Sequence, residues 1–359
     1  MKSDHTVRPA TNLASSSSIS QSQSVHPDRG TGNSSAACGW FVVCVGVVTA
    51  YTGWAGAASG AELAKKGPAA SPVAAPGWAL CRKIATPRKL DKFPNVPSGS
   101  IFGFTSGTGV GEPGDCGIAF EYTGRAGKTD GSYRRGTLET QFGATVADNV
   151  SVTLSPFFIS HHIRNVTDLD DLNRTRFDGL SGEVRYRFLQ RSARMPLAAT
   201  FSVEPRWARA AGTSGVGVTA YSAEFKLSVD AVLIADRLFG AMNFNYTPAV
   251  QKTDADPLEK WVRTSSTNVS GALTYQLNDR LFAGGELRYL AAFDGAFLNH
   301  QIGYAIFAGP TMLVKITDAA SLNLVWTPQI RGHAINFDRT LDLNHFERHQ
   351  FRAKLATSF

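Results

Sequence analysis

From about residue 115 to its last residue, the chain alternates apolar and polar side chains with a period of two. Successive side chains of a β-strand point to opposite faces, so each alternating segment presents one apolar and one polar face. In the clearest segment, Leu180, Val184 and Tyr186 share one face, while Glu183 and Arg185 share the other. The chain holds about twelve such segments, which predicts an all-β protein.

The connections between the segments distinguish a membrane barrel from a soluble sandwich. Tight turns, as at 147–149 and 278–280, alternate with longer polar loops, as at 164–176 and 332–346. Short turns at one end and long loops at the other are typical of outer-membrane barrels. We therefore expect a transmembrane antiparallel up-and-down β-barrel of about twelve strands, an even number that places both termini on the periplasmic side.

Charged side chains are confined to one face of the alternating segments. A soluble barrel would bury these charges in its core, where each badly paired ion costs several kcal/mol. A membrane barrel with apolar faces outside avoids this cost and keeps Lys and Arg from the lipid midplane, where each costs about 2–4 kcal/mol. The expected lumen-lining residues are Glu121, Glu139, Glu183, Glu204, Glu224, Asp230 and Glu286, with Arg185, Arg187, Arg206, Lys226, Arg288, Lys315, Arg331, Arg348, Arg352 and Lys354.

The composition excludes several other classes of protein. After residue 61, no run approaches the roughly 18–20 apolar residues of a membrane-spanning helix. The net charge is +7, but Lys and Arg are spread along the chain, so we expect no nucleic-acid partner. The glycine-rich residues 107–114 contain Pro113 and precede a strand, unlike a phosphate-binding loop. The acidic residues within 168–173 lack the ligand pattern of a calcium loop, so we expect no metal and no cofactor.

The N-terminal part of the chain differs in composition from the alternating part. Residues 1–61 are expected to form a signal peptide with a long n-region, because an apolar stretch runs into small residues before Glu62; a membrane-anchoring helix is the alternative. Residues 62–111, rich in Pro, Ala and Lys, are expected to be a largely irregular periplasmic tail, and 112–359 the barrel. The alternative is that the basic tail from residue 62 folds into the lumen and closes it. Cys81 and Cys116 remain after signal cleavage, and the sequence leaves open whether they are bonded.

The C-terminal segment FERHQFRAKLATSF has alternating apolar residues that include Phe351, and it ends in Phe359. It resembles the signal by which the barrel-assembly machinery recognises bacterial outer-membrane proteins. Together with IFGFTSGTGVGEPGD, IRNVTDLDDLNRTRFDGLSGEVRYRFL and GGELRYL, it makes residues 100–359 resemble an uncharacterised, porin-like family of Gram-negative outer-membrane barrels. The resemblance implies this fold in the bacterial outer membrane, with lipids and the assembly machinery as partners, and it implies no substrate.

Three functions fit these observations. A narrow channel or transporter for small polar solutes is the first; ten basic and seven acidic residues on the charged face give +3, which predicts a mild anion preference. A filled structural or surface-binding barrel is the second, because pairs such as Glu183 and Arg185 can form ion pairs that close the lumen. The third is a lipid hydrolase using Ser160 and His162, but no orienting Asn is identifiable, so we expect no catalytic site and no enzyme.

Overall fold

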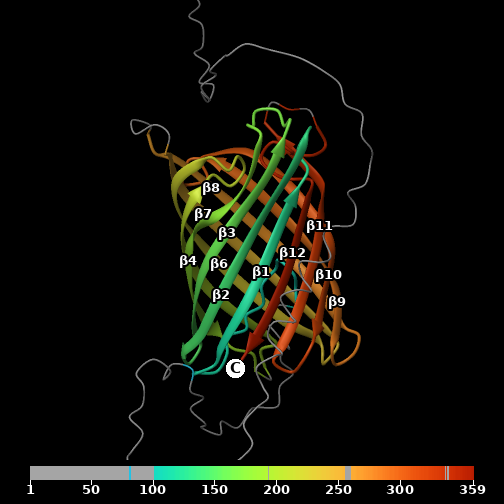
Figure 1. Ribbon diagram of the computed structural model, residues 1–359. Coiled ribbons are helices and arrows are strands. Elements are labelled where there is room, and N and C mark those ends of the chain that lie inside the picture. Colours follow the sequence, from blue (N-terminus) through green and yellow to red (C-terminus); the bar gives the residue numbers. More distant parts are fainter. Residues whose placement is uncertain (1–80, 82–100, 193, 255–259, 336, 338) are drawn as a thin grey trace, which may run out of the picture. The chain divides into compact units, whose positions relative to one another are not determined.

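Twelve antiparallel strands close into a barrel in the computed structural model, which describes residue 81 and residues 101–359 except 193, 255–259, 336 and 338. Each strand pairs with its neighbours in sequence, and β12 pairs with β1 to close the ring (Figure 1). The predicted all-β, up-and-down barrel of about twelve strands is therefore confirmed. The strands are β1 (Cys116–Ala126), β2 (Ser132–Ala147), β3 (Val150–Arg164), β4 (Leu172–Leu189), β5 (Leu197–Ala210), β6 (Gly217–Ile234), β7 (Leu238–Thr253), β8 (Val262–Gln276), β9 (Leu281–Asp294), β10 (His300–Lys315), β11 (Ala320–Ala334) and β12 (His349–Ser358).

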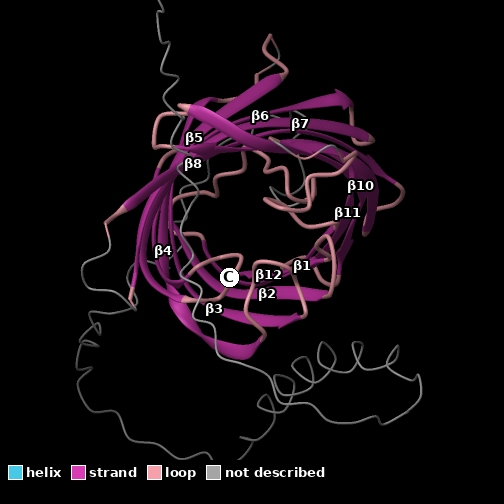
Figure 2. Ribbon diagram, turned by 90° about the horizontal axis from the view of Figure 1, so that it is seen from above, coloured by secondary structure: helices cyan, strands magenta, loops and turns pink. Residues whose placement is uncertain are grey.

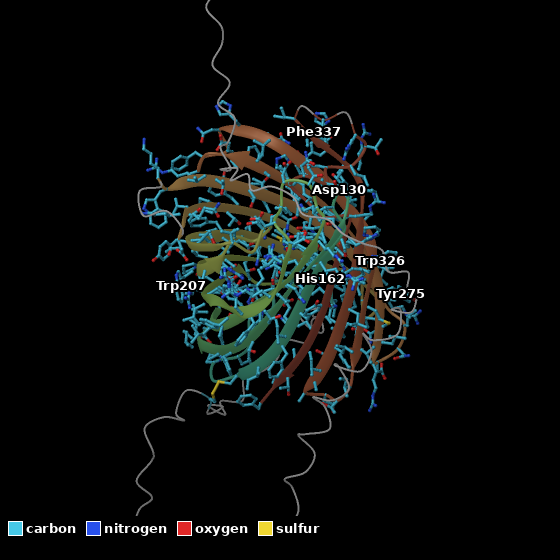
Figure 3. All side chains as sticks on the ribbon, turned by 45° about the horizontal axis from the view of Figure 1, so that its top comes forward. Asp130, His162, Trp207, Tyr275, Trp326 and Phe337 are labelled. Atoms are coloured by element: carbon cyan, nitrogen blue, oxygen red, sulfur yellow. A yellow bond between two sulfur atoms is a disulfide. The ribbon has the colours of Figure 1, made fainter. Side chains whose placement is uncertain are left out.

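The outer surface of the barrel is apolar. Val184 and Tyr186 of β4 are each 53% exposed, and the outward side chains of the other strands include Trp326 and Tyr275 (Figure 3). A soluble monomer rarely exposes a continuous apolar surface of this kind, whereas a barrel in hydrocarbon requires it. No helix long and apolar enough to cross a membrane occurs in the part of the chain that the structure describes.

The two ends of the barrel differ in the length of their connections. At one end, β2 and β3 are joined by Asp148 and Asn149 alone, and Asn149 adopts a positive φ of 64°, as a tight hairpin requires. The start of β1 and the C-terminus lie at this short-turn end (Figure 1). At the opposite end, the longest connection is the loop 335–348, between β11 and β12. The strands extend into several segments that the sequence assigned to loops, such as Leu172–Arg176 of β4.

Residues 101–111, here called the plug segment, lie inside the barrel. Ile101 and Phe102 are fully buried in an apolar cluster with the inward-facing Phe239, Phe282 and Leu313. Figure 2, a view along the barrel, shows loop segments inside the ring of strands. The sequence assigned 62–111 to a largely irregular periplasmic tail that could also fold into the lumen, and residues 101–111 of this tail lie in the lumen. The expected signal peptide and residues 62–80 and 82–100 of that tail lie outside the described residues.

Residues 342–347 of the loop 335–348 also fold into the barrel, from the long-loop end. Phe346 packs against the inward-facing Ala305 and Phe307, and Asp342 and Glu347 are almost fully buried. The plug segment and this loop fill much of the interior beside β7 to β11, here called the filled half. The rest of the interior is here called the open half; it lies mainly beside β1 to β6 and β12 and is also bordered by Asn245 of β7, Asn268 of β8 and Arg288 of β9.

Candidate functional site

The open half contains a cavity of about 900 Å³. Its lining includes Asp115 and Ser358 near the short-turn end, and Arg125 and Gln251 near the long-loop end. The cavity therefore extends along the length of the barrel beside the plug segment. A cavity of this volume is large enough to admit a small solute.

Eight basic and seven acidic residues line the cavity. Eleven of the seventeen residues that the sequence placed on the lumen face are among them: Glu121, Glu139, Glu183, Glu204, Glu224, Arg185, Arg206, Lys226, Arg288, Arg352 and Lys354. The sequence analysis missed Asp115, Arg125, Arg135 and Asp178, although Arg125 and Arg135 continue the same alternation towards the long-loop end. The excess of one positive charge is smaller than the +3 summed from the sequence, so a mild anion preference is no longer expected from charge alone.

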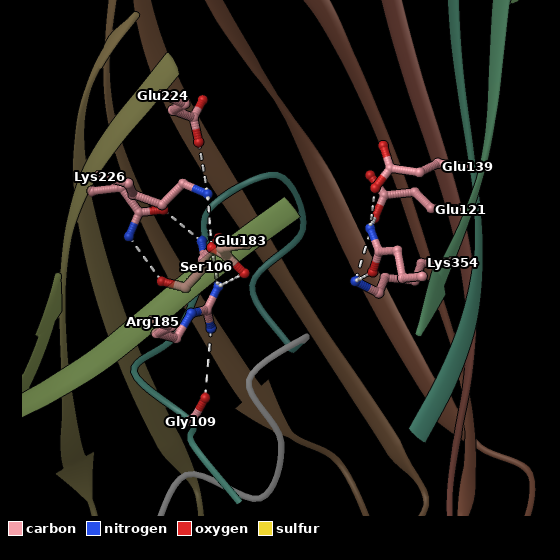
Figure 4. Close-up of polar contacts among 11 residues, drawn as sticks. Ser106, Gly109, Glu121, Glu139, Glu183, Arg185, Glu224, Lys226 and Lys354 are labelled. Carbon is pink, nitrogen blue, oxygen red and sulfur yellow. Dashed lines mark hydrogen bonds and ion pairs between the residues drawn. The ribbon is translucent and has the colours of Figure 1, made fainter. Parts of the chain in front are cut away.

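On one wall of the cavity, carboxylates and cations of β12, β1 and β2 form a connected group (Figure 4). The Lys354 Nζ lies 3.4 Å from the Glu121 Oε2, and the Arg352 Nε lies 3.6 Å from the Glu121 Oε1. Lys354 also donates a hydrogen bond of 2.6 Å to the Gln141 Oε1, and the Gln141 Nε2 donates one of 2.9 Å to Glu139. These contacts fix both cations against the wall.

On the facing wall, β4 and β6 carry a second group of ion pairs (Figure 4). An Arg185 nitrogen lies 3.1 Å from Glu183, and the Lys226 Nζ lies 2.8 Å from Glu224 and 3.9 Å from Glu183. Arg185 also donates a hydrogen bond of 3.5 Å to the carbonyl oxygen of Gly109 in the plug segment. This group therefore forms part of the boundary between the cavity and the plug segment.

Asp230 and Glu286, which the sequence placed on the lumen face, bind the plug segment instead of lining the cavity. The backbone N–H and hydroxyl of Thr105 both donate to Glu286, at 3.0 and 3.2 Å. The backbone N–H and hydroxyl of Thr108 donate to Asp230, at 2.7 and 2.8 Å. Asn243 adds two hydrogen bonds with the backbone of Ser106, and Arg191 forms an ion pair with Asp230. Charge-assisted hydrogen bonds of this kind are stronger than neutral ones, so the plug segment is firmly anchored.

Several predicted lumen cations also contact the plug segment or lie at the ends of the barrel. Arg288 lies over the ring of Phe104 at 4.1 Å, and Arg187 donates to the carbonyl oxygen of Val110. Lys315 lies over the ring of Phe282, which belongs to the apolar cluster around Ile101 and Phe102. Arg331 and Arg348 are exposed, and Arg348 lies in the loop before β12, so neither lines the cavity. The prediction that Arg348 faces the lumen is wrong because β12 starts only at residue 349. The prediction for Arg331 is wrong because a shift in the β10–β11 register beside it changes which side chains face inward.

Contacts between the loop 335–348 and the first hairpin bridge part of the long-loop end of the interior. The Lys128 Nζ donates to the carbonyl oxygens of Asn344 and Phe346, at 3.1 and 3.0 Å. Burial lowers the pKa of Lys128, while the negative charges of Glu347 and Asp342 act in the opposite direction. The Arg125 guanidinium lies 3.5 Å from Glu347 and adds a second link to the loop.

Ser160 and His162 lie on the outer face of β3, as the sequence predicted. The structure adds Asn173 of β4 directly opposite His162, a residue that the sequence analysis did not identify as a partner. No hydrogen bond between described residues joins the three, and the Ser160 hydroxyl instead donates to the Gly136 carbonyl oxygen at 3.4 Å. In this structure, Ser160 and His162 are therefore not joined as a nucleophile and its base. No group of three or more metal-ligating side chains occurs among the described residues.

The two ends of the barrel chain meet at the seam between β1 and β12. Phe359 donates its backbone N–H to Cys116 at 2.9 Å, and Phe351 pairs with Gly124. Phe351 and Phe359 are 41% and 56% exposed, so both aromatic rings of the proposed assembly signal are accessible. Cys116 is joined to Cys81 by a disulfide, which encloses the plug segment in a covalent loop.

A sequence profile described as a family of unknown function, DUF6662, matches residues 95–359. The chain belongs to this family. The DUF6662 match covers the plug segment as well as the barrel, which agrees with the packing of residues 101–111 inside the strands. No characterised protein sequence matches the chain.

Solved structures similar to this DUF6662 chain are outer-membrane barrels. The COG4313 outer membrane channel from Pseudomonas putida F1 is 9% identical with a TM-score of 0.51, over 74% of this chain and 100% of that one. The KdgM porin in complex with disordered oligogalacturonate is 12% identical with a TM-score of 0.39, over 68% and 99% of the two chains. The NanC porin is 15% identical with a TM-score of 0.38, over 67% and 98%. The first likeness shows that the two proteins share a barrel fold, and the other two add no further argument.

Proposed function

We propose that this DUF6662 protein is a narrow channel or transporter for small polar solutes in the bacterial outer membrane. The observation that carries the proposal is the cavity of about 900 Å³, whose lining reaches from the short-turn end to the long-loop end of the barrel. A solute in this cavity contacts mainly charged and hydroxyl side chains, which replace its hydration shell. The apolar outer surface and the barrel fold support the membrane location, with the short turns on the periplasmic side.

The filled half supports a low conductance. The plug segment and the loop 335–348 occupy the interior beside β7 to β11, so the path for solutes is only part of the barrel's cross-section. The same observation favours a second candidate function, in which the barrel is closed and its loops bind a surface partner. The two candidates differ in one measurable property, which is passage of ions through the isolated protein.

Single-channel recording in planar lipid bilayers tests the proposal. The mature chain from residue 62 is compared with a variant that lacks residues 62–100, because this tail adjoins the plug segment in sequence. We expect small, discrete conductance steps in both forms, with weak selectivity between K⁺ and Cl⁻. Folded protein without conductance steps in either form would favour the closed barrel. Release of fatty acids from phospholipid vesicles that is lost in Ser160→Ala would overturn both candidates in favour of an enzyme.

A further inference from the structure

Glu204 differs from the other glutamates that line the cavity. Its side chain faces the lumen from β5, directly opposite Glu224 of β6. Glu121, Glu139, Glu183 and Glu224 each have an ion-pair partner. Within the described chain, Glu204 forms neither an ion pair nor a hydrogen bond. A carboxylate in a lumen of paired charges is therefore left with its acceptor oxygens unused.

The charges around Glu204 are mostly negative. The strongest electrostatic interactions of Glu204 are with Lys226 and with three carboxylates, those of Glu224, Glu139 and Glu183. The single ammonium among them is shared, because the Lys226 Nζ lies 2.8 Å from Glu224 and 3.9 Å from Glu183. Like charges directly opposite each other on antiparallel strands repel. A further cation between Glu204 and Glu224 would relieve this repulsion.

A neutral acceptor lies beside the two carboxylates. Asn245 of β7 is 7% exposed and faces the interior, where it pairs in register with Lys226. Its side-chain amide lies beside the Glu224 carboxylate, and its Oδ1 has no hydrogen-bond partner. The Oδ1 of Asn268, opposite Asn245 on β8, also has none. A buried acceptor without a donor is costly, so the four strands β5 to β8 present oxygens that a donor group would stabilise.

The chemistry of these groups selects a particular ligand. Carboxylate and amide oxygens only accept here, so the complementary group carries a positive charge and several N–H donors. A primary ammonium meets both conditions with three donors. A divalent metal fits less well, because Ca²⁺ takes about 6–8 oxygen ligands, and the described residues hold no cluster of three metal-ligating side chains.

We propose that Glu204, Glu224 and Asn245 form a binding site for the ammonium group of a small solute inside the open half of the lumen. The site rests on the proposed function, because a solute reaches Glu204 only through the cavity. It also defines the solute class more narrowly, as small amines and zwitterions in place of polar solutes in general.

Equilibrium binding of n-butylammonium to the detergent-solubilised mature protein tests the site, with n-butyrate as the probe of opposite charge. Ligand-observed NMR or calorimetry measures binding without any need for conductance. We expect n-butylammonium to bind and n-butyrate not to bind. Glu204→Gln keeps the shape of the side chain and removes its charge, so the affinity for n-butylammonium should fall at least about tenfold. Asn245→Ala should weaken it about threefold, because a neutral acceptor contributes less than a charged one.

Glu121→Gln is the matched control. It removes the same charge from the same cavity, but Glu121 is already paired with Lys354 and Arg352, so n-butylammonium binding should change less than about twofold. Circular dichroism of every variant checks that the barrel has folded. Equal affinities in wild type and Glu204→Gln would overturn the site, as would Ca²⁺ binding that displaces n-butylammonium at lower concentration. Conductance without n-butylammonium binding would remove the site and leave the channel, whereas binding without conductance would remove the channel alone.

Discussion

The filled and open halves of the barrel interior are built from different inward-facing side chains. In the filled half, Phe239, Phe282, Phe307 and Leu313 face inward and are almost fully buried. In the open half, the inward positions carry ionic pairs such as Glu183 and Arg185, which remain beside the cavity. The inward-facing apolar side chains pack against the plug segment and the loop 335–348, whereas the charged side chains line a cavity that can hold water and solutes. In this barrel, inward-facing aromatic residues therefore mark the part of the interior that the chain itself occupies.

The filled half should depend on apolar packing far more than the open half. Phe282→Ala leaves a void in the cluster around Ile101 and Phe102, and we expect it to lower the free energy of unfolding by about 3–5 kcal/mol. Thr153 in the open half borders an existing cavity, so Thr153→Ala should change the free energy of unfolding by less than about 0.5 kcal/mol. Urea unfolding in lipid vesicles measures both values. Similar losses in the two variants would mean that the halves do not differ in packing.

Loss of the two carboxylates that anchor the plug segment should open the filled half. In the Asp230→Ala, Glu286→Ala double variant, the N–H and hydroxyl donors of Thr105 and Thr108 lose hydrogen bonds that each contribute about 1.5–3 kcal/mol. We expect the single-channel conductance to rise about twofold or more, as the plug segment leaves the lumen.

Glu139→Ala is the control for the double variant, because it removes a lumen carboxylate that does not contact the plug segment. Its conductance should stay within about a third of the wild-type value. Chymotrypsin provides a second measurement, since release of the plug segment exposes Phe102 and Phe104 to cleavage. A double variant that resists chymotrypsin and conducts as wild type would show that other contacts hold the plug segment.

Two glycines, one in each half of the barrel, provide a comparison with a smaller expected effect. A β-carbon at Gly303 in the filled half would clash with Asp342 and His345 of the loop 335–348, whereas one at Gly143 in the open half meets only ordinary contacts. Gly303→Ala should lower the free energy of unfolding by about 1–3 kcal/mol and increase proteolysis of the loop at Arg339. Gly143→Ala should leave both properties unchanged. Equal proteolysis of the two variants would indicate that the loop docks independently of Gly303.

The pH dependence of loop docking should give the smallest effect. Burial lowers the pKa of Lys128 from its usual 10.5, so the unfolded chain keeps this proton to higher pH than the folded protein does. The free energy of unfolding should therefore rise with pH across the window between the lowered pKa and 10.5. Lys128→Met removes this contribution, and unfolding measured from pH 8 to 11 should show a shallower slope in the variant. A steeper slope in Lys128→Met would contradict the lowered pKa.

Much of the barrel could be predicted because its information is local. The alternation of Leu180, Glu183, Val184 and Arg185 along one strand decides which face meets lipid, and no distant residue is needed to see it. The plug segment could not be predicted in the same way. Ile101 and Phe102 become core residues only because Phe239, Phe282 and Leu313 face inward from three strands that are far apart in sequence.

The candidate site, too, could be predicted from the sequence only in part. The sequence identified Glu204, Glu224 and Lys226 as lumen residues from alternation alone. It did not show that Lys226 is shared between Glu224 and Glu183 while Glu204 has no partner, because that outcome depends on the angle at which β4, β5 and β6 curve around the lumen. Asn245 had no charge to distinguish it, and its unpaired oxygen exists only in the folded arrangement.

The local pattern of residues is enough to make this chain an all-β barrel with apolar side chains outside and ionic ones inside, since each strand carries its two faces in its own residues. The division of the interior, with the plug segment and one loop on one side and a charged cavity on the other, arises only in the folded protein. Pairing between neighbouring strands follows from local pattern, whereas the contacts that hold a segment inside the lumen exist only after the ring has closed.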